Sequence, residues 1–188
     1  MNMIKETKLY VIRHGEARGN KPNDPLTPKG EEQVKKLIDF LLIREEMKVD
    51  QMISSPYLRA TQTADILNNR LNIGYNIDTN LRELDFGVEN GDIDFADQLE
   101  KQFKNFDLKL SGGESNQEVM NRVSILIDKL LLKGGTFILV THRVTLALLL
   151  RYFDDERFGF NECISLTNPD AFVVTLTNHQ NILIEDIW

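Results

Sequence analysis

Short apolar runs that end at polar residues recur along the chain and predict buried strands. Residues 9–12 (Leu-Tyr-Val-Ile) and 136–140 (Thr-Phe-Ile-Leu-Val) are nearly continuous apolar runs, and residues 51–54 are predicted to form a short strand. Runs of this kind are typical of strands that are covered on both faces in a parallel sheet. Residues 16–26 are rich in glycine, proline, asparagine and aspartate, so they predict a loop.

Apolar residues at helical spacing predict helices between these strands. Residues 27–28 (Thr-Pro) and 55–56 (Ser-Pro) are start signals for two helices, and residues 115–118 form a capping box before a third. A short fourth helix is predicted at about residues 144–152. The stripes of the first three helices consist of Val34, Leu37, Ile38, Leu41 and Leu42; Ala60, Ala64 and Leu67; and Val119, Val123, Leu126, Ile127 and Leu130.

The last part of the chain alternates between apolar and polar residues. This alternation covers residues 172–176 and 182–187, with a polar turn between them, and predicts an antiparallel hairpin at a sheet edge. Together the elements predict the α/β class: a three-layer αβα sandwich with a mostly parallel central sheet and a C-terminal antiparallel hairpin. No repeat, low-complexity tract or linker interrupts residues 1–188, so we expect a single domain.

Charge and cysteine content narrow the partners and the compartment. The chain has 22 Lys and Arg residues against 29 Asp and Glu residues, a net charge of −7. This balance argues against nucleic acid and anionic membranes as partners. A single cysteine, Cys163, allows no intrachain disulfide and favours a reducing compartment, and residues 1–8 lack the apolar run of a signal peptide. We therefore expect a cytoplasmic protein.

Four basic residues are predicted to meet at the carboxyl edge of the sheet, where ligands bind in folds of this class. Arg13 and His14 close the first strand, His142 closes another, and Arg59 lies in the first turn of a helix. Arginine forks fit phosphate oxygens, and a helix N-terminus attracts anions. Neighbouring positive charges also favour a neutral histidine, whose lone pair is able to attack phosphorus.

Other common chemistries lack their motifs in this sequence. There is no P-loop, no glycine-rich dinucleotide motif and no zinc-binding spacing of histidines and cysteines. The acidic clusters at residues 92–97 and 154–156 are more typical of solvated faces than of magnesium sites. We therefore expect no metal and no cofactor.

Six segments in order resemble the histidine phosphatase superfamily, the phosphoglycerate mutase-like group whose signature is RHG. The segments are LYVIRHGE (9–16), LTPKG (26–30), SSPYLRATQTA (54–64), LRELDFGVENG (81–91) and SGGES (111–115), followed by VTH (140–142). The resemblance spans most of the chain.

The resemblance implies the roles of the site residues. His14 is expected to be the nucleophile that becomes phosphohistidine, and Glu83 the general acid and base, with Glu16 and Glu89 as nearby alternatives. Phosphate contacts are expected from Arg13, Asn20, Arg59 and His142. Glu16, however, is more typical of a structural hydrogen-bonding residue. Three hydroxyl residues are interpreted as helix caps rather than nucleophiles: Thr27, Ser55 and Ser115.

This sequence departs from the family pattern at three positions. Ala17 replaces a common serine or threonine, Gly19 a common tryptophan, and Arg143 the usual glycine after the second histidine. We expect Arg143 to point into or across the mouth of the pocket and to contact a second anionic group of the substrate.

The expected activity is that of a metal-independent phosphomonoesterase of the histidine acid phosphatase type, acting on a small phosphorylated metabolite. A phosphoglycerate-type mutase with the same site is the nearest alternative, although the segment between Gly91 and Gly113 is shorter than in such mutases. A non-catalytic regulatory protein that binds phosphate esters is a third reading. Residues 92–112 are expected to form a lid over the site, and the hairpin edge allows a homodimer. The sequence leaves the substrate open.

Overall fold

A six-stranded sheet forms the middle layer of the computed structural model, which describes residues 6–44, 48–87, 94–177 and 181–188. The strands are β1 (Thr7–Arg13), β2 (Gln51–Ser54), β3 (Asn76–Ile77), β4 (Gly135–Thr141), β5 (Asp170–Leu176) and β6 (Ile182–Asp186). The helices are α1 (Pro28–Arg44), α2 (Leu58–Leu71), the 3-10 turn η1 (Thr79–Leu81), α3 (Phe95–Lys104), α4 (Asn116–Lys133), α5 (Arg143–Phe153) and α6 (Phe160–Ser165).

The strand order β3-β2-β4-β1-β5-β6 places the two longest parallel strands, β1 and β4, side by side in the centre. β2 and β3 continue the parallel part, whereas β5 and β6 are antiparallel to their neighbours. The predicted mixed sheet and C-terminal hairpin are therefore confirmed. β6 forms one edge of the sheet, and a homodimer through this edge stays a prediction.

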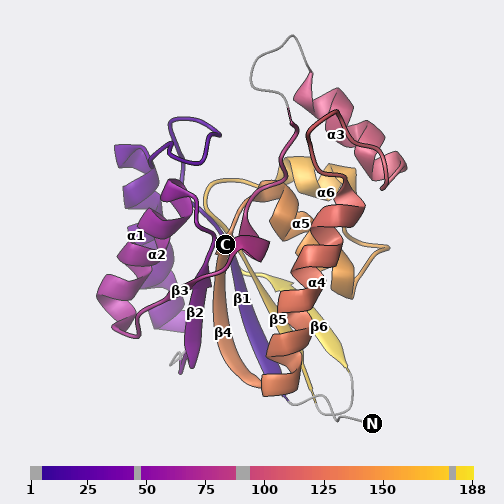
Figure 1. Ribbon diagram of the computed structural model, residues 1–188. Coiled ribbons are helices and arrows are strands. Elements are labelled where there is room, and N and C mark those ends of the chain that lie inside the picture. The colour runs from indigo at the N-terminus through magenta and orange to yellow at the C-terminus, as the bar shows by residue number, and fades with distance from the viewer. Residues whose placement is uncertain (1–5, 45–47, 88–93, 178–180) are drawn as a thin grey trace.

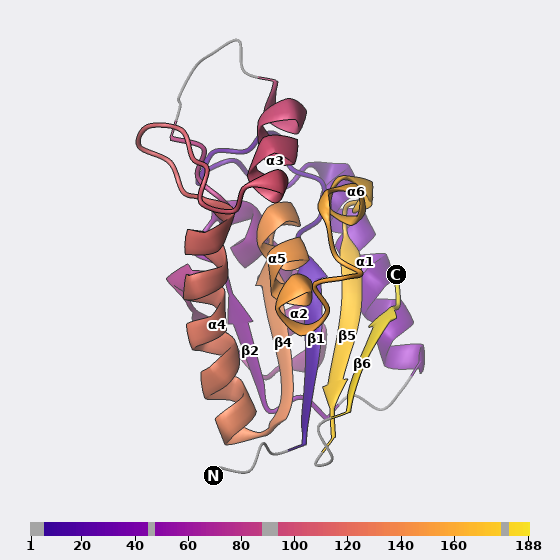
Figure 2. The same cartoon turned by 90° about the vertical axis from the view of Figure 1, so that its right-hand side faces the viewer.

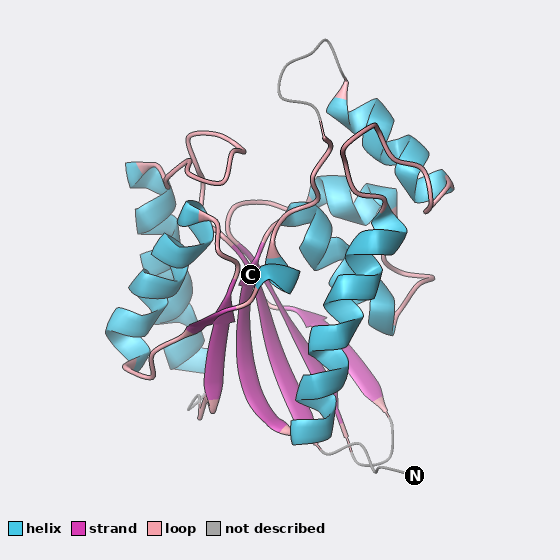
Figure 3. Cartoon of the chain, viewed as in Figure 1, coloured by secondary structure: helices cyan, strands magenta, loops and turns pink. Residues whose placement is uncertain are grey.

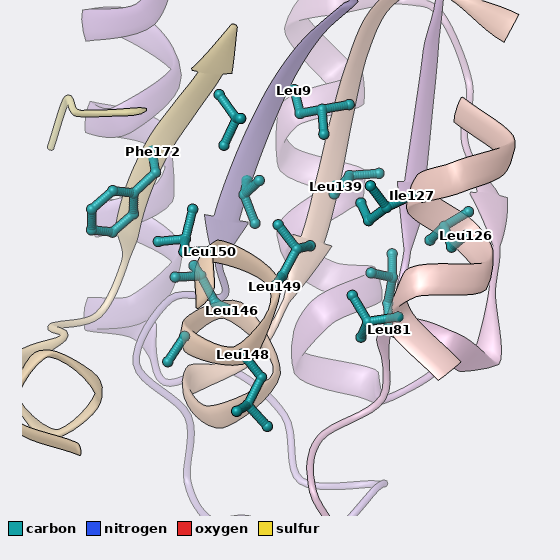
Figure 4. Close-up of a cluster of buried hydrophobic side chains, with 14 of the residues drawn as sticks. Leu9, Leu81, Leu126, Ile127, Leu139, Leu146, Leu148, Leu149, Leu150 and Phe172 are labelled. Atoms are coloured by element: carbon teal, nitrogen blue, oxygen red, sulfur yellow. The ribbon is translucent and has the colours of Figure 1, made fainter. Parts of the chain in front are cut away.

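Helices cover both faces of the sheet, as Figure 1 and Figure 3 show. Helices α1 and α2 lie on one face, and α4, α5 and α6 lie on the other, which faces the viewer in Figure 2. The alternation along β1 explains the two cores: Tyr10 and Ile12 pack in the cluster with α1 and α2, whereas Leu9 and Val11 pack in the opposite cluster. Figure 4 shows the second cluster around Leu146 and Leu149 of α5.

The turn after β1 packs tightly against the start of α1. A Cβ atom on Gly15 would lie 2.5 Å from the carbonyl oxygen of Gly30, and one on Gly30 would lie 2.0 Å from that of Glu16. Both distances are too short for any side chain, so glycine is required at both positions. This close approach fixes the Arg13-His14 segment at the carboxyl edge of the sheet.

Candidate active site

Arg13, the last residue of β1, is anchored inside the protein. Its Nη1 atom donates to the carbonyl oxygens of Leu166 and Thr167, each at 2.7 Å. Burial, and next the positive charge of Arg143, lower the pKa of Arg13 to about 10. The guanidinium stays charged at neutral pH and is held in one orientation.

Two contacts determine which nitrogen of His14 carries the proton. Nδ1 lies 2.6 Å from the carbonyl oxygen of Gly15, which is able only to accept a hydrogen bond. Nε2 lies 3.0 Å from Nε of Arg59, which is able only to donate. His14 is therefore a neutral imidazole with its proton on Nδ1 and a lone pair on Nε2. Burial, and next the charge of Arg59, lower its pKa to about 3.

Arg59 reaches the site from the first turn of α2, as its sequence position predicts. It is 1% exposed, and its Nη1 atom donates to the carbonyl oxygen of Lys21 at 2.8 Å. The guanidinium also lies 5.2 Å from the centre of the Tyr57 ring, a cation–π distance. Burial lowers the pKa of Arg59, while the nearby Glu83 carboxylate raises it. Together, the loop between β1 and α1 and the start of α2 thus fix the position of the Arg59 side chain.

His142 completes the cluster from the end of β4. Its ring centre lies 5.0 Å from that of His14, in an edge-on arrangement, and its Nε2 atom shares a 2.7 Å hydrogen bond with Oγ of Ser55. His142 is fully buried, and burial, then the neighbouring His14 and Arg59, lower its pKa well below 6.5. In the described part of the chain, its Nδ1 atom has no hydrogen-bond partner.

Glu83 is held at the N-terminus of α5, the helix that begins beside His142. Its carboxylate accepts hydrogen bonds from the backbone N–H groups of Val144 and Thr145, both at 3.1 Å, and from that of Leu84 at 2.9 Å. Free N–H groups at a helix N-terminus stabilise a negative charge. Glu83 also raises the pKa of Arg13 and Arg59, so its charge acts on the same pocket as the four basic residues.

Three successive carbonyl groups before Glu83 are each held by a side chain. Nη1 of Arg122 donates to Asn80, Oγ1 of Thr141 donates to Leu81 at 2.7 Å, and Oγ1 of Thr145 donates to Arg82 at 2.7 Å. Such buried bonds restrict the backbone. The position of Glu83 is therefore fixed by α4, β4 and α5 together.

An ion-pair network in the SGGES segment supports the same region. The Glu114 carboxylate accepts from Nε and Nη2 of Arg122 at 3.0 and 3.2 Å, and also from Nη2 of Arg82. Glu114 is 14% exposed at its side chain, so water screens this network only in part. Arg82, which directly precedes Glu83, belongs to this network.

Comparison with known proteins identifies the family. The profile of the histidine phosphatase superfamily (branch 1) matches residues 9–185. The chain belongs to the histidine phosphatase superfamily. The curated Escherichia coli protein named "Probable phosphoglycerate mutase GpmB" is 30% identical over 159 residues, which cover 76% of this chain and 73% of that protein. Membership in this superfamily supports a phosphatase or mutase activity.

Solved structures share the fold of this histidine phosphatase superfamily member. The phosphoglycerate mutase of Bacillus anthracis superposes with a TM-score of 0.80 at 20% identity, covering 99% of this chain and 94% of that one. A mycobacterial glucosyl-3-phosphoglycerate phosphatase superposes with a TM-score of 0.77 at 20% identity, covering 97% and 98%. At this identity the likeness shows the fold alone.

The structure brings most of the predicted site residues of this superfamily member together, but not all of them. Asn20 is exposed in the loop after β1, and among the described residues its side chain makes no hydrogen bond. Glu16 accepts from Oγ1 of Thr27 at 2.9 Å and from Lys29, which agrees with a structural role. Glu89 lies outside the described residues. The assigned roles of these residues stay predictions.

One predicted helix cap is wrong. Tyr57, not Ser55, occupies the N-cap position of α2, which begins at Leu58. The hydroxyl of Ser55 accepts from the backbone N–H of Tyr57 at 3.3 Å, and it also bonds to His142, because β2 and β4 are neighbours and their ends lie side by side. The caps predicted at Thr27 and Ser115 are confirmed: Oγ1 of Thr27 accepts from Gly30, and Oγ of Ser115 from Glu118.

Sequence reasoning missed two residues that shape this site. Nδ2 of Asn168 donates to the carbonyl oxygen of His14 at 2.9 Å, although the two residues are far apart in the chain. The centre of the Tyr57 ring lies 5.1 Å from that of the His142 ring, in an edge-on arrangement, so Tyr57 packs against the cluster of basic residues. The SSPYLR segment was a signal for Tyr57; no local pattern pointed to Asn168.

Part of the predicted lid is described. Helix α3 and the following residues, up to 112, extend beyond the carboxyl ends of the strands (Figure 1), whereas residues 92 and 93 lie outside the described part. Phe103 and Phe106 pack against the core, whereas Phe95 is 52% exposed. That this segment covers the substrate stays a prediction.

The described residues were also compared with the requirements of a metal site and of a membrane-spanning helix. The described ranges contain no group of three His, Cys, Asp or Glu residues able to hold a metal ion. No helix in these ranges has both the length and the apolar character needed to cross a bilayer.

Proposed function

We propose that this chain hydrolyses a small phosphate monoester through a phosphohistidine on His14, without a metal ion. The observation that carries the proposal is the lone pair on Nε2 of His14, which is kept free of a proton by burial and by Arg59. A neutral imidazole in a pocket of arginines is suited to attack a phosphoryl group that those arginines bind. The charge comes from Arg13 and Arg59, so the reaction requires no metal.

The first step transfers the phosphoryl group to the enzyme. Nε2 of His14 forms a bond to phosphorus while the bond from phosphorus to the ester oxygen breaks, and protonated Glu83 gives its proton to that oxygen. Arg13, Arg59 and His142 bind the phosphoryl oxygens and stabilise the charge spread over them in the transition state. The hydrogen bond from Arg59 to Nε2 is exchanged for bonds to phosphate oxygens as substrate enters.

The second step returns His14 to its starting state. Water attacks phosphorus, Glu83 takes one of its protons, and the bond between phosphorus and Nε2 breaks with its electron pair returning to the nitrogen. Inorganic phosphate leaves. Glu83 serves both steps because the N-terminus of α5 holds its carboxylate in place.

A mutase is the second candidate, since the 30% identical relative carries that name. A mutase would return the phosphoryl group to substrate rather than to water. Release of inorganic phosphate without a bisphosphate primer supports the phosphatase; phosphoryl exchange that depends on such a primer supports the mutase. The short segment between Gly91 and Gly113 favours the phosphatase, because a short cover leaves the intermediate open to water.

Trapping the intermediate tests the proposal. The protein is mixed with a phosphate ester labelled in its phosphoryl group and quenched in base, in which phosphohistidine survives. We expect label on the wild-type protein and none on His14→Ala. On Glu83→Gln we expect label that is lost more slowly, because hydrolysis of the phosphohistidine is slowed. An unlabelled wild type would support the regulatory binding protein. Treatment with EDTA is expected to leave the rate unchanged.

A further inference from the structure

Arg143 presents an unpaired guanidinium beside the site. It is the first residue of α5 and directly follows His142. Its Nε atom is buried without a hydrogen-bond partner, and none of its side-chain nitrogens donates a hydrogen bond to any residue that the structure describes. Within the described ranges, no carboxylate lies within ion-pair distance of it. The side chain as a whole is partly exposed, so a ligand is able to reach it.

Arg143 lies between two groups of the site. It follows His142 directly in the chain, and the next residue, Val144, donates its backbone N–H to the Glu83 carboxylate at 3.1 Å. Its charge is the largest cause after burial of the lowered pKa of Arg13, contributes to the lowered pKa of His14, and opposes the rise in the pKa of Cys163 that burial causes. Arg143 is therefore placed beside the groups that are proposed to bind phosphate.

Arg13 and Arg59 gain an opposite charge once a phosphoryl group is bound, whereas Arg143 does not. The two arginines match the two negative charges of a phosphate monoester at neutral pH. The Glu83 carboxylate accepts hydrogen bonds from backbone N–H groups of α5, and among the described residues it makes no ion pair with Arg143. A partly buried positive group without an ion-pair partner is costly unless an anion joins it.

We propose that Arg143 binds a second anionic group of the substrate, a carboxylate or a second phosphoryl group. This inference rests on the proposed function, because it takes the group bound by Arg13 and Arg59 to be a phosphoryl group. A planar guanidinium binds either kind of anion through two parallel hydrogen bonds. The substrate class is then a phosphate ester with a second anion on the same small molecule, rather than an ester of a neutral alcohol.

Binding of unreactive phosphonates tests this proposal without turnover. Calorimetric titration compares methylphosphonate with phosphonoacetate and phosphonopropionate, which carry the same phosphonate group plus one carboxylate. We expect the wild type to bind at least one carboxylated probe about 10-fold or more tightly than methylphosphonate. Arg143→Gln is expected to lose this preference while it still binds methylphosphonate, and Arg143→Lys to keep part of it.

The matched control is Arg70→Gln, which removes the same charge from the outer face of α2. Arg70 pairs with Asp39 at 2.5 Å, and both side chains are about half exposed. This control is expected to keep the wild-type preference, which separates a local contact from the net charge. A wild type without the preference, or a preference that survives Arg143→Gln, would overturn the proposal.

A failure of the proposed hydrolytic reaction and a failure of the proposed Arg143 subsite give different results. If the wild type binds the carboxylated probes more tightly but never carries label on His14, the subsite stands and the hydrolytic reaction does not. If label is trapped on His14 and both probe types bind equally, the reaction stands and the subsite does not. Steady-state kinetics compare two matched esters, phosphoglycerate, which carries a second anion, and glycerol phosphate, which does not. The proposal is supported if Arg143→Gln raises the KM for phosphoglycerate and leaves the KM for glycerol phosphate unchanged.

Discussion

His14→Gln is expected to make the protein less sensitive to acid. Burial and Arg59 lower the pKa of His14 from 6.5 to about 3, so the folded protein excludes a proton that the unfolded chain accepts. The difference corresponds to roughly 5 kcal/mol when both states have reached their limits. Glutamine has a similar shape and does not titrate, so it removes this difference.

The sign of the effect follows from the direction of the pKa shift. Above about pH 7 both states hold a neutral histidine, and His14 makes no pH-dependent contribution. As the pH falls below 6.5, the unfolded state gains the proton first and the free energy of unfolding decreases until about pH 3. Between about pH 8 and about pH 5, His14 alone accounts for a loss of roughly 2 kcal/mol.

Urea unfolding, followed by far-UV circular dichroism, measures this loss at the two pH values. We expect the free energy of unfolding of the wild type to fall by roughly 2 kcal/mol more than that of His14→Gln. His142, whose pKa is also lowered, destabilises both proteins in acid in the same direction. Only the difference between the two proteins is therefore assigned to His14.

Equal acid sensitivity of the two proteins would refute the reasoning. It would mean that His14 takes up its proton over the same pH range in the folded and in the unfolded state, so that burial and Arg59 do not favour its neutral form. The same result would remove the observation on which the proposed reaction rests, namely that burial and Arg59 keep Nε2 of His14 free of a proton. If His14 is neutral, the acid limb of the rate profile belongs to other groups of the coupled site.

Three further substitutions test the site and its support. Arg59→Lys is expected to lower kcat/KM for p-nitrophenyl phosphate at least about 100-fold, because an ammonium group lacks the planar fork; a near wild-type value would contradict this role. Thr145→Val removes the hydroxyl that holds the carbonyl group before Glu83, so kcat should fall about 10-fold with little change in KM; a pure KM effect would argue against positioning. Ser115→Ala removes half of the capping box of α4 and should cost ~1 kcal/mol in urea unfolding with kcat unchanged; no loss of stability would show that the cap adds nothing.

The sequence by itself determined where the candidate site residues Arg13, His14, Arg59 and His142 lie in the fold. Apolar runs that stop at Arg13-His14 and at His142 put these residues at strand ends, and parallel strand ends meet at one edge of a sheet. Arg59 follows from the helix that starts after β2. These inferences succeed because the spacing of apolar residues and the signals that start a helix are local: each depends on only a few neighbouring residues of the chain.

Only the tertiary structure decided how the site is assembled. The contact of Arg59 with Nε2 of His14, the attachment of Glu83 to α5 and the bond from Asn168 to the His14 carbonyl each join residues that lie far apart in the chain. The hydrogen bond between Ser55 and His142 could not be predicted from the sequence for the same reason. Hydrogen bonds of this kind depend on which elements pack together, and a local pattern of residues carries no record of that packing.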